Sequence, residues 1–242
     1  MKLYTPDELD ALGANHTYPY TLKEFLERKK KGMIYKPNEW AFVHVPKNAG
    51  TSFVRPLRNP KRREKLGLEL LNKGPSLHHN KWDWWSRFDE VKDLTPVGIC
   101  RNPWSRALSM YLYNIKNAAA NIEEEWGRFD HARLSWEGFK RSWMPDGFFV
   151  DKHGIDFEYD KNTGRAWAQD EPQTSWLPDD GVWFRMEDQL EDFEKYVGYE
   201  MPEKLNTTPH ARHLDYYDSE LIERIGELFA ADVEKFGYEP KI

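Results

Sequence analysis

The stretch WAFVHVPKNAGTSF, residues 40–53, decides the fold class of this chain. Its first six residues, 40–45, form an almost unbroken apolar run, which is typical of a strand buried on both faces of a sheet. The turn that follows contains Gly50, and a Thr-Ser pair after the glycine can open a helix. Backbone N–H groups in such a turn converge on an anion, and Lys47 adds a full positive charge. The pattern predicts a turn that binds phosphate or sulfonate, although an ordinary strand-to-helix turn with a surface lysine has the same pattern.

This turn differs from the Walker A loop of P-loop kinases. That motif requires a Gly-Lys dipeptide followed by Ser or Thr, and no Gly-Lys dipeptide occurs in the chain. Here the lysine precedes the glycine and the loop is shorter. The sequence therefore argues against a P-loop kinase.

A second apolar run, residues 96–100, leads into RNPWSRALSMY, residues 101–111. The proline favours a helix start, and apolar residues then recur at helical spacing. Arg101 leaves the strand end, and Ser109 lies in the second helical turn, close enough to share an anion with it. Arg106 belongs to the same helix. Because arginine binds phosphate with a planar fork, the pattern indicates a second phosphate site, and a capped helix with surface arginines is the alternative.

The rest of the chain continues to alternate strands with helices. We predict a third strand at residues 181–186, a helix at residues 188–196 and a final helix that begins at residue 218 or 219 and stops at Gly237. Such alternation implies an α/β fold, a three-layer α/β/α domain with a mainly parallel central sheet. Ligands of these sheets bind at the carboxyl ends of the strands, where both motifs lie.

We expect a single domain over residues 1–242, with its core in residues 40–240. Residues 1–38 are interpreted as an N-terminal helical extension, because capping signatures occur at Thr5 and Thr21. Residues 117–180 are irregular and are expected to hold long loops.

Composition narrows the class of protein. Hydrophobic residues make up 39% of the 242 residues and aromatic residues 15%, so the chain is expected to fold. Cys100 is the single cysteine, which excludes an internal disulfide and a cysteine-rich zinc site. The net charge of -6 disfavours a nucleic-acid binder. No apolar run is long enough for a membrane span and the first residues lack a secretory pattern, so we expect a cytoplasmic protein.

Together, FVHVPKNAGTSF and ICRNPWSRALSMY resemble motifs of the sulfotransferases that use 3′-phosphoadenosine-5′-phosphosulfate (PAPS), especially the carbohydrate sulfotransferase-like branch. Their order and spacing are similar to that family's 5′-phosphosulfate loop and 3′-phosphate motif. Two later segments, residues 173–190 and 216–238, are also similar to the family. The resemblance covers about residues 40–240 and implies a P-loop-like sulfotransferase fold with PAPS as the sulfonate donor.

The resemblance implies a role for each motif residue. Lys47 would contact the bridging oxygen and the transferring sulfonate, while Arg101 and Ser109 would bind the 3′-phosphate. Arg106 is a further candidate contact to the nucleotide. Gly50, Thr51 and Ser52 would bind the 5′-phosphate. The whole cofactor-binding loop comprises Pro46, Lys47, Asn48, Ala49, Gly50, Thr51 and Ser52. Transfer by positioning and charge stabilisation requires no metal.

A general base must accept the proton of the acceptor hydroxyl. Related carbohydrate sulfotransferases carry a catalytic histidine between the two phosphate motifs, and His78 and His79 lie in that interval. We choose His79 over His78, and a polar loop pair without a catalytic role is the alternative. His44 lies inside the first strand and is expected to be structural. His210 and His213 have helical spacing, but no carboxylate or cysteine pattern completes a metal site.

The expected acceptor is a hydroxyl of a carbohydrate. A basic stretch over residues 55–65 could attract an anionic glycan or the cofactor, and a solvated helix face is an equal explanation. The tryptophans could stack on sugar rings, although core packing explains most of them. A phenol, a peptidyl tyrosine or a small alcohol are alternative acceptors. A nucleotide-binding relative that has lost catalysis would carry the same motifs.

Overall fold

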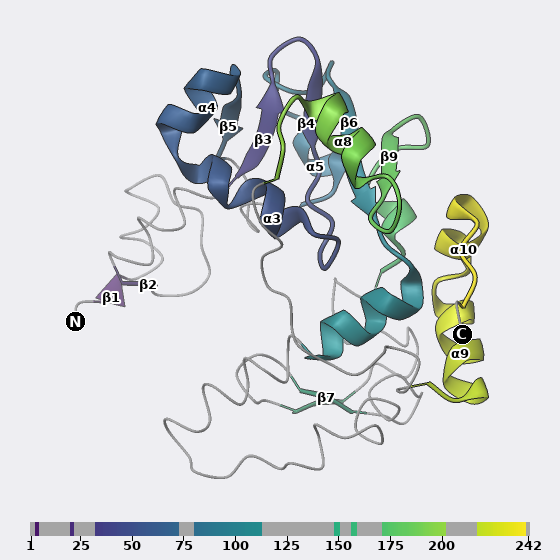
Figure 1. Cartoon of the computed structure of the whole chain (residues 1–242). Coiled ribbons are helices and arrows are strands. Elements are labelled where there is room, and N and C mark those ends of the chain that lie inside the picture. Colours follow the sequence, from purple (N-terminus) through teal and green to yellow (C-terminus); the bar gives the residue numbers. More distant parts are fainter. Residues whose placement is uncertain are drawn as a thin grey trace. The chain divides into compact units, whose positions relative to one another are not determined.

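The computed structural model describes residues 32–72, 80–112, 171–201 and 217–240 with their side chains. Outside these ranges it gives two antiparallel strand pairs, β1 (Leu3–Tyr4) with β2 (Tyr20–Thr21) and β7 (Phe148–Val150) with β8 (Asp156–Glu158). The chain divides into two compact units, whose helices and strands are labelled in Figure 1. The first comprises Met1–Cys100 with Ser175–Leu205, and the second comprises Arg101–Thr174 with Asn206–Ile242.

The first unit is built on a five-stranded mixed sheet in the order β5-β3-β4-β6-β9. Its strands are β3 (Met33–Lys36), β4 (Trp40–Phe42), β5 (Glu69–Leu71), β6 (Thr95–Cys100) and β9 (Val182–Arg185). β4, β6 and β9 run parallel, as the alternation of strands and helices predicts. β3 runs antiparallel to both β4 and β5. The sheet is therefore mixed rather than mainly parallel, and the fold class is mixed α/β.

The antiparallel part of the sheet arises from a tight β3–β4 hairpin. Asn38 in its turn has a positive φ of 63°, which asparagine tolerates better than most residues. The Glu39 N–H donates to the Lys36 carbonyl at 3.1 Å and closes the turn. Residues 33–36, which the sequence assigns to a helical N-terminal extension, are thus a strand. The two helices predicted within that extension fall outside the described residues, apart from Thr21 in β2.

Strand β4 buries alternate side chains on opposite faces of the sheet, as the apolar run predicts. On one face, the Phe42 ring lies 4.6 Å from the ring of Phe53 in α3 (Gly50–Val54). It also lies 5.7 Å from the ring of Phe193 in α8 (Leu190–Val197). Trp40 joins the same cluster, with its ring 6.3 Å from Phe53. Helices α3 and α8 therefore cover this face of the sheet.

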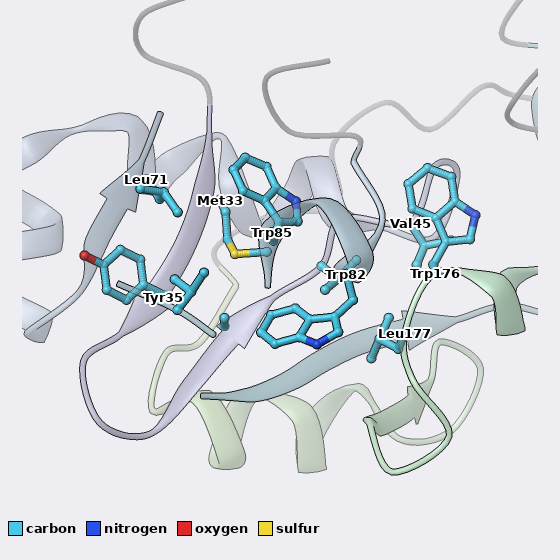
Figure 2. Packing of buried hydrophobic residues seen from close by; sticks show 11 residues of the cluster. Met33, Tyr35, Val45, Leu71, Trp82, Trp85, Trp176 and Leu177 are labelled. Carbon is cyan, nitrogen blue, oxygen red and sulfur yellow. The ribbon is translucent and has the colours of Figure 1, made fainter. Parts of the chain in front are cut away.

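Tryptophans fill the cluster on the opposite face. Trp82 and Trp85 come from α5 (Trp82–Trp85) and pack against Met33 and Tyr35 of β3. Figure 2 shows the labelled members of this cluster, with Leu71 and Tyr35 at one end and Val45 and Trp176 at the other. Trp82, Trp85 and Trp176 are at most 8% exposed. These tryptophans are core residues, which agrees with the core explanation and leaves them unavailable for sugar stacking.

The basic stretch after the phosphate loop forms short exposed helices. These are η1 (Pro56–Arg58) and α4 (Pro60–Leu66), and none of the α4 residues is buried. The Asn59 side chain caps α4 by accepting a hydrogen bond from the Lys61 N–H at 3.0 Å. Gly67 ends the helix with a positive φ of 65°. The solvated-helix explanation of this stretch is therefore supported by its exposure.

In the second unit, residues 103–112 form the helix that the sequence predicts after the second strand. Asn102 caps it by accepting hydrogen bonds from the backbone N–H groups of Trp104 at 3.1 Å and Ser105 at 3.3 Å. The Trp104 indole N–H donates to the Ile222 carbonyl of α9 (Ser219–Leu228) at 2.9 Å. This bond joins the two helices within the unit.

The predicted final helix is present but broken. Asp218 caps α9 by accepting from the Leu221 N–H at 2.9 Å, and Gly237 ends α10 (Ala230–Phe236) with a φ of 63°. Between the two helices, Phe229 leaves helical geometry with a φ of -114°. The break turns Asp232 inward, where its side chain has no exposed surface.

Within the described residues, no helix is both long and apolar enough to cross a membrane.

Candidate functional site

The turn after β4 has the backbone geometry of an anion-binding loop. The Val43 N–H extends the pairing with β6 by donating to the Val97 carbonyl at 2.8 Å. The chain then turns with Lys47 at a φ of 70° and Ala49 at a φ of 59°, both in the left-handed region. That region costs a non-glycine residue about 1–2 kcal/mol. A left-handed residue followed by the helical Gly50 aims successive N–H groups into one concavity, which is the arrangement that binds anions.

Asn48 anchors this loop to the sheet. Its side-chain amide donates to the Ile99 carbonyl in β6 at 2.8 Å, and the residue is only 1% exposed. The sequence places Asn48 in the cofactor-binding loop, and the structure uses its side chain to hold the loop at the carboxyl end of the neighbouring parallel strand. Asn48 is thus fixed by the sheet rather than turned toward solvent.

Gly50 is required by the close approach of His44. A Cβ atom at Gly50 would lie 2.1 Å from Cδ2 and 2.5 Å from Nε2 of the His44 ring. His44 is 4% exposed and its ring lies 6.1 Å from that of Phe42. Strand β4 ends at Phe42, so His44 lies two residues beyond the strand in which the sequence places it. It is packed beneath the loop, which agrees with the expected structural role.

Burial alternates along the loop. Four of its residues are buried, namely Pro46, Asn48, Gly50 and Ser52. Lys47, Ala49 and Thr51 are half-buried. The ammonium of Lys47 and the hydroxyl of Thr51 are thus the side-chain groups of the loop best placed to meet a ligand from solvent, together with backbone N–H groups.

The second motif begins with Arg101, whose backbone is bonded on both sides to one side chain. The Arg101 N–H donates to Oε1 of Gln173 at 2.8 Å, and Nε2 of Gln173 donates to the Arg101 carbonyl at 2.8 Å. Gln173 lies in η3 (Gln173–Ser175) and has no exposed surface. Its amide is in turn bonded to Asp232 at 3.1 Å. The sequence identifies neither Gln173 nor Asp232 as a site residue.

The charge of Arg101 acts on the hydroxyl of Tyr217. That hydroxyl donates to the Trp104 carbonyl at 2.6 Å. Burial of the hydroxyl raises the pKa of Tyr217 well above its ordinary value of 10.0, while the charge of Arg101 and a hydrogen bond with the Leu108 backbone oppose the rise. Tyr217 as a whole is half-buried, so its hydroxyl end is the enclosed part. Arg101 and the backbone just before Ser109 therefore act on the same hydroxyl group.

The other two residues of the second motif differ in accessibility. Ser109 is half-buried on the helix of residues 103–112. Arg106 is fully buried, donates to the Glu171 carbonyl at 3.0 Å and lies 5.7 Å from the centre of the Phe229 ring. The sequence predicts Arg106 as a nucleotide contact, but its enclosed guanidinium is used inside the second unit. We therefore leave Arg106 out of the candidate site.

The predicted base lies beyond what the structure describes. His78 and His79 fall in residues 73–79, and His210 and His213 in residues 202–216, all outside the described residues. Among the residues that are described, no group of three or more His, Cys, Asp or Glu side chains is placed to hold a metal ion.

Comparisons with protein-family models, with curated proteins and with solved structures find no match to this chain.

Proposed function

We propose that this protein is a sulfotransferase that moves the sulfonate group of PAPS to a hydroxyl group of a carbohydrate. The observation that carries the proposal is the turn after β4, where Lys47 and Ala49 hold left-handed angles directly before α3. Non-glycine residues in this region are strained, and such strain is typical of ligand-binding turns. The motif order that resembles the PAPS-dependent sulfotransferases gives the ligand its identity.

In this proposal the loop binds the 5′-phosphosulfate end of the donor. The backbone N–H groups around Gly50 and the Thr51 and Ser52 residues contact the 5′-phosphate. Lys47, which is half-buried, contacts the bridging oxygen and the sulfonate. The Asn48 bond to the sheet keeps the loop in place during transfer.

Arg101 and Ser109 bind the 3′-phosphate, which distinguishes PAPS from ATP. Arginine presents several N–H donors in a plane and keeps its charge at every physiological pH. Ser109 lies half-buried on the helix of residues 103–112, which follows Arg101 in the order that the family motif requires. A charge-assisted hydrogen bond of this kind contributes roughly 1.5–3 kcal/mol.

The proposed reaction exchanges one bond to sulfur for another. The acceptor oxygen forms a bond to sulfur, while the bond from sulfur to the bridging phosphate oxygen breaks. The electron pair stays on the departing 3′,5′-bisphosphoadenosine (PAP), where Lys47 stabilises the charge. The acceptor proton passes to His79, with His78 as the second candidate. The chain thus contributes mainly position and charge.

Turnover with an acceptor panel tests this proposal. PAP release from PAPS is measured with an oligosaccharide, a simple phenol, a tyrosine peptide and a short alcohol, each against a blank without acceptor. We expect release that depends on the oligosaccharide. Release with the phenol, the peptide or the alcohol alone would correct the acceptor and keep the donor. PAP binding without turnover on any acceptor would identify a relative that has lost catalysis, and failure to bind PAP would overturn the proposal.

A further inference from the structure

The Gln173 side chain pairs with Arg101 as a peptide group would. Its amide oxygen accepts from the Arg101 N–H and its amide nitrogen donates to the Arg101 carbonyl, each at 2.8 Å. Both backbone groups of Arg101 are therefore satisfied by one side chain that is 72 residues away in the sequence. Because both backbone groups of the residue are held, its Cα position and the direction of its Cα–Cβ bond are restricted.

A buried carboxylate holds Gln173 in turn. Asp232 has no exposed surface, and its Oδ2 accepts from the backbone N–H of Gln173 at 2.9 Å and from the side-chain Nε2 at 3.1 Å. Its Oδ1 accepts from the Thr174 N–H at 2.9 Å. A buried charge is costly unless hydrogen bonds compensate it, and three donors do so here. The contact fixes which way the Gln173 amide faces, because the group bonded to Asp232 must be the NH₂.

The arrangement joins three segments of the second unit at Arg101. Arg101 is the first residue of the second unit. Gln173 lies two residues before Ser175, where the chain returns to the first unit, and Asp232 lies three residues after the helix break at Phe229. The pair of Gln173 and Asp232 is not needed to end strand β6. The carbonyl of Cys100, the last residue of that strand, already accepts a hydrogen bond from the Met186 N–H at 2.8 Å. What the pair adds is a fixed orientation for the residue that follows.

We propose that Gln173 and Asp232 are positioning residues, which set the Arg101 guanidinium for recognition of a 3′-phosphate. This inference rests on the proposed function, in which Arg101 binds that group. Asp232 orients the Gln173 amide, the amide fixes the Arg101 backbone, and the fixed backbone limits the region that the guanidinium can reach. Neither Gln173 nor Asp232 touches the nucleotide.

The test compares PAP with 5′-AMP, which lacks the 3′-phosphate, by calorimetric titration of the full chain. Gln173→Met keeps the side-chain length and removes both bonds to Arg101. We expect this variant to bind PAP about tenfold more weakly and to bind AMP as the wild type does. The tenfold loss is part of the roughly 10- to 100-fold affinity that a charge-assisted hydrogen bond supplies. Asp232→Asn keeps one acceptor oxygen, so it is expected to fold and to show a smaller shift in the same direction.

The matched control is Ile225→Val, a fully buried position of α9 in the same unit. It lowers stability without touching the pair, so its PAP-to-AMP affinity ratio should equal that of the wild type. In an Arg101→Ala background, Gln173→Met should have no further effect on PAP binding, because it acts through Arg101.

The outcomes separate this inference from the proposed function. If the wild type prefers PAP and the folded variants keep the full preference, or lose PAP and AMP binding equally, the positioning role is wrong and the proposed function stands. If the wild type binds PAP and AMP equally, the assigned role of Arg101 is wrong, and the positioning role is overturned with it.

Discussion

At the level of single residues, Ala49 carries backbone strain in the turn that follows β4. Its φ of 59° favours glycine, and relief of the left-handed cost of about 1–2 kcal/mol exceeds the added chain entropy of about 0.4–1 kcal/mol. We therefore expect Ala49→Gly to raise the free energy of unfolding by up to about 1 kcal/mol, as measured by urea denaturation.

The same chemical change elsewhere supplies the control for Ala49→Gly. Ala231 is exposed in helix α10, where glycine costs about 1 kcal/mol. Ala231→Gly should therefore lower stability while Ala49→Gly does not. Equal losses for the two variants would show that Ala49 is not left-handed in solution.

Lys47 is expected to act in the transition state, because negative charge on the bridging oxygen grows as the bond to sulfur breaks. Lys47→Ala should lower kcat by more than it raises KM for PAPS, by roughly 100-fold if it acts as a single charge-stabilising donor. Lys65→Ala, at an exposed position of α4, is the matched control and should retain normal turnover. A Lys47→Ala enzyme with normal kcat and raised KM would reduce Lys47 to a binding residue.

At the scale of elements, a side-chain cap marks the beginning of helix α9. The Asp218 carboxylate accepts from the Leu221 N–H at 2.9 Å and starts α9, which carries the buried Leu221 and Ile225. Asp218→Ala should lower the free energy of unfolding by about 1 kcal/mol, and Asp218→Asn should lose much less, because asparagine caps almost as well. Thermal denaturation of the two variants measures this difference, and equal losses would argue against a capping role.

Elements with strong periodicity or capping signals could be predicted from the sequence. Strand β6, strand β9 and helix α8 lie within two residues of their predicted positions, because apolar runs and spacing mark them. Strand β3 was missed because four residues give too little pattern, and its hairpin places an antiparallel pair in the sheet. The helix break at Phe229 could not be predicted, because apolar residues recur at helical spacing on both sides of it.

For the candidate site, Lys47 and Arg101 remain predictions that follow from residue type and motif position. Burial could not be predicted from the sequence. Arg106 and Arg101 are both arginines of the second motif, but Arg106 is buried inside the second unit. Gln173 and Asp232 matter through contacts across 59 residues of sequence, which spacing does not reveal. Asp232 had one available signal, because it lies three residues after Phe229 and four before Phe236, at helical spacing from both members of the apolar stripe.

For the whole molecule, two tyrosines with raised pKa values predict how stability depends on pH. Burial, the hydrogen bond to Glu69 and the charges of Glu69 and Glu90 raise the pKa of Tyr35. Burial raises that of Tyr217. The folded protein favours the neutral form of both hydroxyls. Their contribution to the free energy of unfolding is therefore present below the unfolded pKa of about 10 and is lost as the pH rises above that value.

Urea denaturation between about pH 8 and pH 11 measures that loss. The free energy of unfolding should fall above about pH 10, and Tyr217→Phe should reduce the slope although it lowers stability at neutral pH by removing the bond to the Trp104 carbonyl. A slope that is unchanged in Tyr217→Phe would contradict the burial of its hydroxyl.

The central claim is that the chain recognises a nucleotide with phosphates at both the 5′ and 3′ positions. Calorimetric titration of the wild type with PAP and with 5′-AMP tests it most directly. We expect PAP to bind at least tenfold more tightly, and Arg101→Ala to weaken PAP binding by about one to two decades without changing AMP binding, because a charge-assisted bond contributes roughly 1.5–3 kcal/mol. Equal affinity of the wild type for PAP and AMP would contradict the account.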